Sequence, residues 1–281
     1  MRRPAPSGPG PPEGGPTTRT GLDAARLATA HLADVIPRIT EEQWELPSAC
    51  AGWRVIDVMA HLAALATEAI DPPQPDPAWP QNRERYHDMR VNERRNWSHA
   101  DVLDEWSRST PRQLDLLETA QRTPHANEIV NVPGLGSYPR HLLANTMAFN
   151  VFCHLYNDIL APGGPLPFTV PEPTDSLVAP AIEFMLAGLP QMQGPELTAT
   201  VSEPLVIELT GPGATTVTIF PAAGPGRRLS VALGADGATR IRSTALDFIA
   251  WGTTRKPWRE HCEITGDAST AGPFLDCLNI I

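Results

Sequence analysis

The sequence CAGWRVIDVMAHLAAL, residues 50–65, joins a tight turn to an apolar helix that carries one histidine. Gly52 suits the turn, because glycine adopts backbone angles that other residues avoid. The apolar residues after it predict a helix over 54–69, which ends at the proline-rich stretch 71–80. His61 lies in this helix among small and aliphatic side chains, where a charged imidazole would be costly. A neutral imidazole, such as one that binds a cation, fits this position.

The same helical periodicity covers the first two thirds of the chain. Apolar spacing and proline or glycine breaks predict further helices over 20–36, 82–96, 98–122, 140–160 and 174–189. Ser98 is expected to cap the third of these, and Pro111 to kink or divide it. The stretch PGLGSYP, residues 133–139, is expected to be a loop.

Beyond Pro195 the pattern changes to alternation with β-branched residues. The segments LTATV, LVIEL, TVTIF, LSVAL and TRIR, separated by glycine-rich turns, predict a small antiparallel sheet. Helices are expected at 244–252 and in the C-terminal AGPFLDCLNII. The fold class is therefore mainly α plus α+β. A proline-rich disordered arm is expected over 1–20, a four-helix bundle over 21–192 and a small α+β domain over 193–281.

Composition narrows the function classes. With 41% hydrophobic and 19% charged residues, the chain of 281 residues is typical of a globular protein. A net charge of −10 argues against a nucleic-acid partner, which needs a basic face. No apolar run approaches the ~18 residues that span a membrane, and no signal peptide is visible, so a cytoplasmic location is expected. The four cysteines form no C-x-x-C pair and are expected to be reduced.

A second histidine on another apolar helix makes His61 a candidate metal ligand. His154 lies on the other long apolar helix, with Asn150 four residues before it and Asp158 four residues after it. Bundles build metal sites from imidazoles on two facing helices, and histidine ligands favour zinc, with nickel, cobalt, iron and manganese also open. Asn150 is a weaker ligand than a carboxylate, and Asp158 is a further candidate that would approach His154 from the opposite side.

Each of these residues also has a purely structural interpretation that involves no metal or substrate. A single buried histidine is most often a hydrogen-bonded core residue. Trp53 is expected to be a packing anchor, and Asp57 to cap or pair at the start of its helix. The remaining histidines have no partner at ligand spacing and are expected to be surface or core residues: His31, His87, His99, His125, His141 and His261.

The motif CAGWRVIDVMAHL resembles the opening motif of the mycothiol-dependent maleylpyruvate isomerase family, a group of DinB-like metal-binding four-helix bundles. His61 falls on the first metal histidine of that family. FNVFCHLYNDILAP resembles its second metal segment, in which an acidic residue precedes a histidine by four positions; Asn150 and His154 stand there. The stretch STALDFIAWGTTRKPWREHCEITGD resembles its second, sterol-carrier-like domain, with Arg255 nearest to the family's arginine.

The resemblance implies an active site between the two domains, where mycothiol, a thiol cosubstrate, meets a divalent metal. A bound metal would lower the pKa of the thiol and so supply a thiolate nucleophile. Arg255, or next Arg259 and Arg242, would hold a carboxylate of a small-molecule substrate. Arg255 and Asp158 are the candidate catalytic residues, and His61, His154 and Asn150 the candidate metal ligands. Family members include isomerases and S-transferases, several of them in specialised metabolism.

Two other functions stay open at this point. Because Asn150 replaces a carboxylate, the pocket could have lost its metal and catalyse a cyclisation or elimination by shape and hydrogen bonding. A pocket between two domains could also bind a small apolar ligand without chemistry.

Overall fold

The computed structural model describes residues 20–80, 82–122, 124–224 and 226–280. The arm predicted over 1–20 lies outside this part of the chain, apart from Thr20, which begins the first helix. The helices are α1 (Thr20–Val35), α2 (Glu41–Trp44), α3 (Val55–Ile70), α4 (Arg83–Asn92), α5 (His99–Ala120), α6 (Leu142–Cys153), α7 (Asp175–Gly188), α8 (Pro195–Thr200), α9 (Ala245–Gly252) and α10 (Ala268–Cys277). The strands are β1 (Ile129–Val132), β2 (Gly136–Pro139), β3 (Leu205–Thr210), β4 (Thr215–Phe220), β5 (Ser230–Leu233), β6 (Thr239–Thr244) and β7 (Glu263–Thr265).

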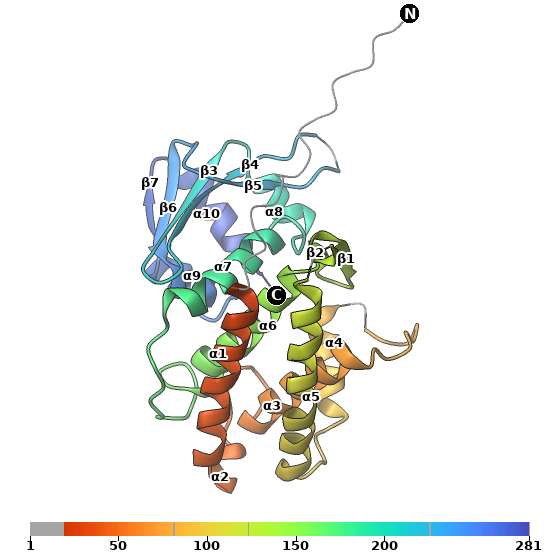
Figure 1. Ribbon diagram of the computed structural model, residues 1–281. Helices are drawn as coiled ribbons and strands as arrows, with labels where there is room; N and C mark the ends of the chain where they lie inside the picture. The colour runs from red at the N-terminus through yellow and green to blue at the C-terminus, as the bar shows by residue number, and fades with distance from the viewer. Residues whose placement is uncertain (1–19, 81, 123, 225, 281) are drawn as a thin grey trace, which may run out of the picture.

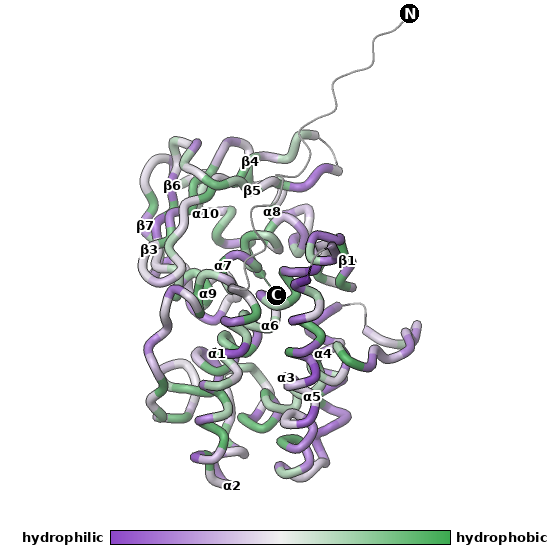
Figure 2. Tube along the Cα trace, in the orientation of Figure 1, coloured by the Kyte–Doolittle hydropathy of each residue, from purple (hydrophilic) through white to green (hydrophobic). Residues whose placement is uncertain are grey.

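The helical bundle and the sheet occupy opposite ends of the molecule (Figure 1). In the bundle, α3 packs against α5, and α1 packs against α6 and α7. Hydrophilic and hydrophobic residues alternate along α1 and α5 in Figure 2, as expected for helices with one buried side. The expected fold class, a helical bundle followed by an α+β part, is confirmed, and the predicted boundary after residue 192 falls between α7 and α8.

The large sheet is mixed. Its strand order is β5-β4-β3-β6-β7, and β3 runs parallel to β6 while the other neighbours are antiparallel. The expectation of a wholly antiparallel sheet is therefore wrong for one strand pair. The reason is topological, because two hairpins carry the chain from β3 to the β5 edge, and the next strand crosses to the other side of β3. Sequence alternation alone carries no information about this crossing.

Three local predictions need correction. The segment LTATV lies in and just after α8 rather than in a strand, because Pro195 occupies the first turn of a helix, where its missing N–H costs nothing. The expected loop at 133–139 includes β2, which forms a hairpin with β1 around Gly134. Pro111 does not divide α5, which is continuous and is capped by Ser98 as predicted.

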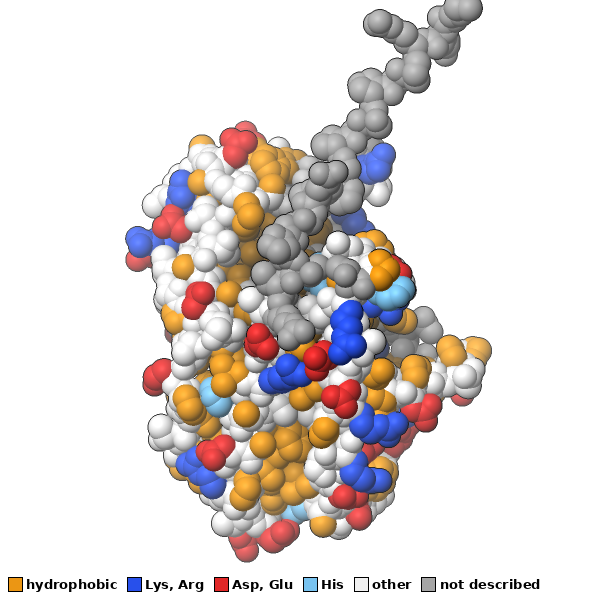
Figure 3. Space-filling model, in the orientation of Figure 1, with side chains coloured by type: hydrophobic (Ala, Val, Ile, Leu, Met, Phe, Trp, Pro, Cys, Tyr) orange, Lys and Arg blue, Asp and Glu red, His pale blue; other side chains and the backbone are white. Residues whose placement is uncertain are grey.

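Buried apolar residues form one continuous cluster from the bundle to the sheet. The aromatic rings of Phe149 in α6 and Phe184 in α7 lie 5.4 Å apart, and α7 also contacts α9. None of the described helices is long and apolar enough to cross a membrane. On the face shown in Figure 3, Lys and Arg side chains are interspersed with Asp and Glu.

Candidate active site

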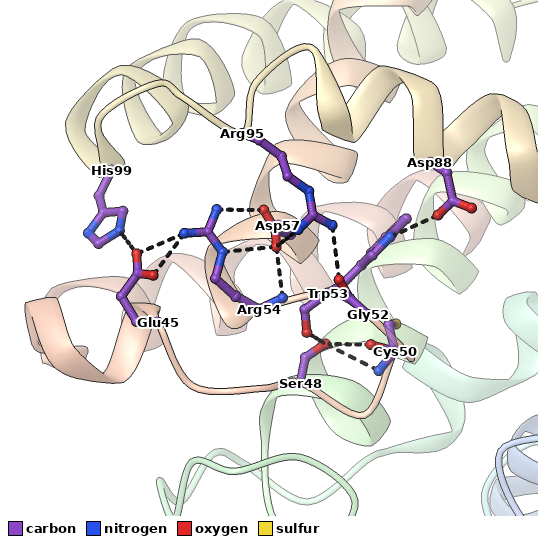
Figure 4. A network of polar contacts seen from close by, with 10 residues as sticks. All are labelled: Glu45, Ser48, Cys50, Gly52, Trp53, Arg54, Asp57, Asp88, Arg95 and His99. Atoms are coloured by element: carbon purple, nitrogen blue, oxygen red, sulfur yellow. Dashed lines mark hydrogen bonds and ion pairs between the residues drawn. The ribbon is translucent and has the colours of Figure 1, made fainter.

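The turn before α3 is held by a polar network (Figure 4). The Arg54 guanidinium donates to both carboxylate oxygens of Asp57, and the Arg54 backbone N–H donates to Asp57 Oδ2 at 2.8 Å. Arg95 donates to the carbonyl oxygen of Gly52, which has the positive φ of 79° that the turn requires. Trp53 Nε1 donates to Asp88 at 3.0 Å. The expectation that Asp57 caps and pairs at the start of its helix is confirmed, and the network fixes Trp53 above the helix.

Replacing Asp57 by asparagine is expected to lower the free energy of unfolding by about 2–3 kcal/mol at pH 7, because a cap and a charged hydrogen bond are lost. Burial alone would raise the pKa of Asp57, but the hydrogen bonds from Arg54 bring it below its usual value. The contribution of Asp57 is thus present above about pH 4 and is lost as the pH falls through the folded-state pKa.

Urea unfolding at pH 7 and at lower pH would measure this difference, which should shrink below about pH 4. Asp23→Asn is the matched control, because Asp23 also lies in the first turn of a helix but is exposed. An Asp57→Asn variant no less stable than Asp23→Asn would contradict the role of the network.

Three imidazoles from three helical segments meet in the interior. The ring centroids of His61 in α3 and His154 just after α6 lie 4.9 Å apart, and the centroids of His61 and His87 in α4 lie 4.6 Å apart. The Trp53 ring lies 5.2 Å from His61. The expectation that His61 and His154 converge from separate helices is confirmed. The expectation that His87 has no partner is wrong, because tertiary packing brings α4 against α3, a contact that spacing within one helix does not reveal.

The imidazoles of His61 and His87 are held neutral. Burial, together with the neighbouring His154 and His87, keeps the pKa of His61 well below its usual value. Burial, then Arg83 and His154, lower the pKa of His87 to about 3. His61 Nδ1 is buried and has no hydrogen-bond partner among the described residues. A neutral imidazole with a free nitrogen lone pair is the form that binds a metal ion.

His154 is oriented by a buried carboxylate and an arginine from the other end of the chain. The chain continues from α6 into a π-helical segment, His154–Ile159, in which His154 Nδ1 lies 2.7 Å from Asp158 Oδ2. Arg255, just after α9, donates from Nε to Asp158 Oδ1 and from Nη2 to Asp158 Oδ2, each at 2.8 Å. Burial opposes ionisation of Asp158, but the hydrogen bonds from His154 and Arg255 outweigh it and hold its pKa well below the usual range. In the neutral tautomer that donates Nδ1–H to Asp158, His154 has its Nε2 lone pair free for a metal ion.

Among the described residues, the group of His, Cys and Asp side chains with ligand atoms within 4.8 Å of one another is Cys50, His154 and Asp158. Cys50 Sγ lies 3.8 Å from His154 Nδ1. Burial and the Asp158 carboxylate raise the pKa of the Cys50 thiol, which disfavours the thiolate that a metal would need. Because Arg255 already contacts both oxygens of Asp158, this group is better described as a hydrogen-bonded chain than as a metal centre.

The other predicted site residues lie as follows. Asn150 is half-buried and donates from Nδ2 to the carbonyl oxygen of Thr146 at 3.1 Å, which leaves Oδ1 as its only ligand atom. The guanidinium of Arg259 contacts Asp276, and Arg242 lies 3.6 Å from Glu208. The substrate clamp implied for Arg255 stays a prediction, because two of its donors are engaged with Asp158 within the protein.

A cavity of about 650 Å³ opens beside the histidines. It lies between α3, α4, α5, α6 and the β1–β2 hairpin, and both His87 and Asn150 line it. A volume of this size accommodates a small molecule with most of its surface buried. The predicted metal segment thus adjoins a space that a substrate can occupy.

The fold and this site define a two-part protein in which a helical bundle gathers buried histidines beside a small-molecule cavity. Residues 25–157, from α1 through α6 into the π-helical segment, match the family described as "Mycothiol maleylpyruvate isomerase N-terminal domain".

Two solved structures share the fold. A mycothiol-dependent maleylpyruvate isomerase is 14% identical with a TM-score of 0.55, and a histidine-to-alanine variant of such an enzyme is 15% identical with a TM-score of 0.54. Each alignment covers 87% of this chain and 91% of the other. Comparison with curated protein sequences gave no match.

Proposed function

We propose that this protein is a mycothiol-dependent S-transferase or isomerase, acting on a small electrophilic metabolite in the cytoplasm, with a divalent metal, zinc first, bound by His61 and His154. A role in specialised metabolism is part of this proposal. The observation that carries it is the 4.9 Å separation of the two imidazole centroids in a buried site beside a cavity. The family of the N-terminal domain supports the thiol dependence.

The residues fit a metal ion. Two imidazoles bound to one tetrahedral zinc place their ring centroids about 5 Å apart, given usual Zn–N distances. His61 offers a neutral ring, and His154 donates its other N–H to Asp158, the usual arrangement of a metal-binding histidine. The fit of these two residues is independent of which group supplies the third ligand.

Each side chain then has a defined part in the reaction. When bound, a divalent metal would lower the pKa of a coordinated thiol and make a thiolate available at neutral pH. Asp158 would accept a hydrogen bond from His154 Nδ1–H and so fix the orientation of the ring that would hold the metal. Arg255 balances the charge of Asp158 and ties the C-terminal part of the chain to this position. The largely apolar cavity wall limits access of water, which would compete with the thiol for the electrophilic substrate.

The third ligand is a choice between Asn150 Oδ1 and His87. Asn150→Glu is expected to raise the affinity for zinc by about tenfold or more, because a carboxylate brings charge and a stronger oxygen donor. Competition with a chromophoric chelator would measure it. Asn157→Glu is the matched control, because Asn157 also donates to a carbonyl four residues earlier but does not line the cavity. Equal zinc affinities of the two variants would exclude position 150 as a ligand position.

The proposed function is tested by measuring the metal content of the purified protein by mass spectrometry and then incubating it with mycothiol and an electrophile. Maleylpyruvate and 1-chloro-2,4-dinitrobenzene serve as the isomerisation and transfer probes. Bound metal together with thiol-dependent turnover supports the proposal. Turnover without metal supports the metal-free cyclisation or elimination alternative, and neither metal nor turnover supports a protein that only binds a ligand.

A further inference from the structure

The cavity contains one arginine, Arg83, that forms no ion pair with the other described residues, although its guanidinium lies 5.1 Å from the centroid of the Tyr86 ring. Arg83 is the first residue of α4 and lines the cavity. Its Nε atom is buried and, within the described part of the chain, has no hydrogen-bond partner. Burial lowers the pKa of Arg83, so the fold itself disfavours this charge. A bound anion would relieve that cost.

Both carboxylates on the cavity wall have other hydrogen-bond partners, although the nearby Glu68 charge partly stabilises the Arg83 guanidinium and raises its pKa. Glu68 accepts a hydrogen bond from Arg90 Nε at 2.6 Å, and Asp76 accepts one from the backbone N–H of Ala78 at 2.8 Å. Among the described residues that line the cavity, Arg83 is the only Lys or Arg. A single guanidinium without a second cation matches a singly charged carboxylate better than a phosphate dianion.

Most of the rest of the wall is apolar, and Trp79, Tyr86 and Trp106 give it three aromatic side chains. Trp79 and Pro80 come from the loop after α3, Trp106 and Leu117 from α5, and Met147 from α6. Such a wall favours a flat or bulky hydrophobic body over a small polar acid.

The anion site and the histidine cluster lie on the same side of α4. Arg83 and His87 are four residues apart, about one helical turn or 6 Å along the axis, and both line the cavity. His87 in turn contacts His61. A molecule held at Arg83 therefore extends naturally toward the histidines.

We infer that Arg83 binds the carboxylate of an apolar substrate whose body fills this cavity and whose reactive carbon faces the histidine cluster; the last part rests on the proposed thiol-dependent function. This gives the substrate class: a hydrophobic monocarboxylic acid. The anchoring arginine comes from the helical bundle, whereas the C-terminal Arg255 serves Asp158.

The test is a direct binding measurement on the purified protein with no thiol added, so that it does not depend on turnover. Isothermal titration calorimetry would compare 1-naphthaleneacetate with 1-naphthaleneacetamide, which has the same shape without the charge. We expect the acid to bind at least about tenfold more tightly, as a charged hydrogen bond to a buried guanidinium provides. Binding of this kind without turnover would overturn the thiol-dependent function but leave the anion site standing.

Three variants complete the test. Arg83→Gln should bind acid and amide within about twofold of each other, whereas Arg83→Lys should retain much of the preference. Arg85→Gln is the matched control, because Arg85 lies on the same helix but its side chain is 77% exposed, and it should bind like the unmodified protein. Thermal unfolding would verify that each variant is folded. An unchanged preference in Arg83→Gln, or no preference in the unmodified protein, would overturn the inference.

Discussion

Replacing His61 and His154 together by alanine is expected to abolish bound metal and to reduce thiol-dependent turnover to the uncatalysed rate. Both proposed imidazole ligands are lost, and a site with only amide or carboxylate oxygen left binds zinc weakly. Either single substitution should have nearly the same effect, because the residues act as one unit. Metal content per chain, measured by mass spectrometry, is the primary readout, and turnover with mycothiol is the second.

The control is His141→Ala. It removes another half-buried imidazole, one whose Nδ1 lies 3.0 Å from the carbonyl oxygen of Ala126 outside the histidine cluster. This variant should keep both metal and activity. If the double variant still bound one metal per chain, the cation would lie elsewhere, and the thiolate chemistry proposed for this site would have to be abandoned.

Asp158→Ala is expected to lower the free energy of unfolding by about 3–5 kcal/mol, because it leaves the largely buried Arg255 guanidinium without its partner. It should also weaken metal binding by about 10–100-fold, since His154 loses the carboxylate that orients its ring. Urea unfolding and chelator competition measure the two effects separately.

Two further variants make this prediction specific. Asp104→Ala removes one partner of an ion pair with Arg108 whose side chains are both mostly exposed, and it should cost less than about 1 kcal/mol. Asp158→Ala combined with Arg255→Ala should recover part of the lost stability, because no buried charge is then left unpaired. If Asp158→Ala cost no more than Asp104→Ala, the contact between Asp158 and Arg255 would contribute little to the fold.

Sequence patterns predict the structure correctly where that structure depends on residues within a single helix or turn. The helix after Gly52, the Ser98 cap, the Asp57 cap and the inward position of His61 all follow from residue types within a few positions of one another. Amphipathic spacing likewise placed His154 on a buried helix face.

The predictions failed where distant segments decide the outcome. The parallel pairing of β3 with β6 depends on a crossing between strands that alternation does not encode. The π-helical segment His154–Ile159 replaces the end of the α-helix predicted over 140–160, and apolar spacing gives no signal for this change. His87 looked isolated because its partner, His61, belongs to another helix.

Local propensity and periodicity are sufficient to predict the helical bundle, the order of its helices and the two histidines on apolar helix faces. The surroundings of those histidines depend instead on tertiary packing. It placed His87 against His61, brought the Arg255 guanidinium onto Asp158 and left Arg83 Nε beside the cavity with no hydrogen-bond partner among the described residues. Contacts between residues far apart in the chain depend on how whole helices and strands pack against one another. The free energy of that packing is a sum over many residues from several segments, so no single segment predicts it.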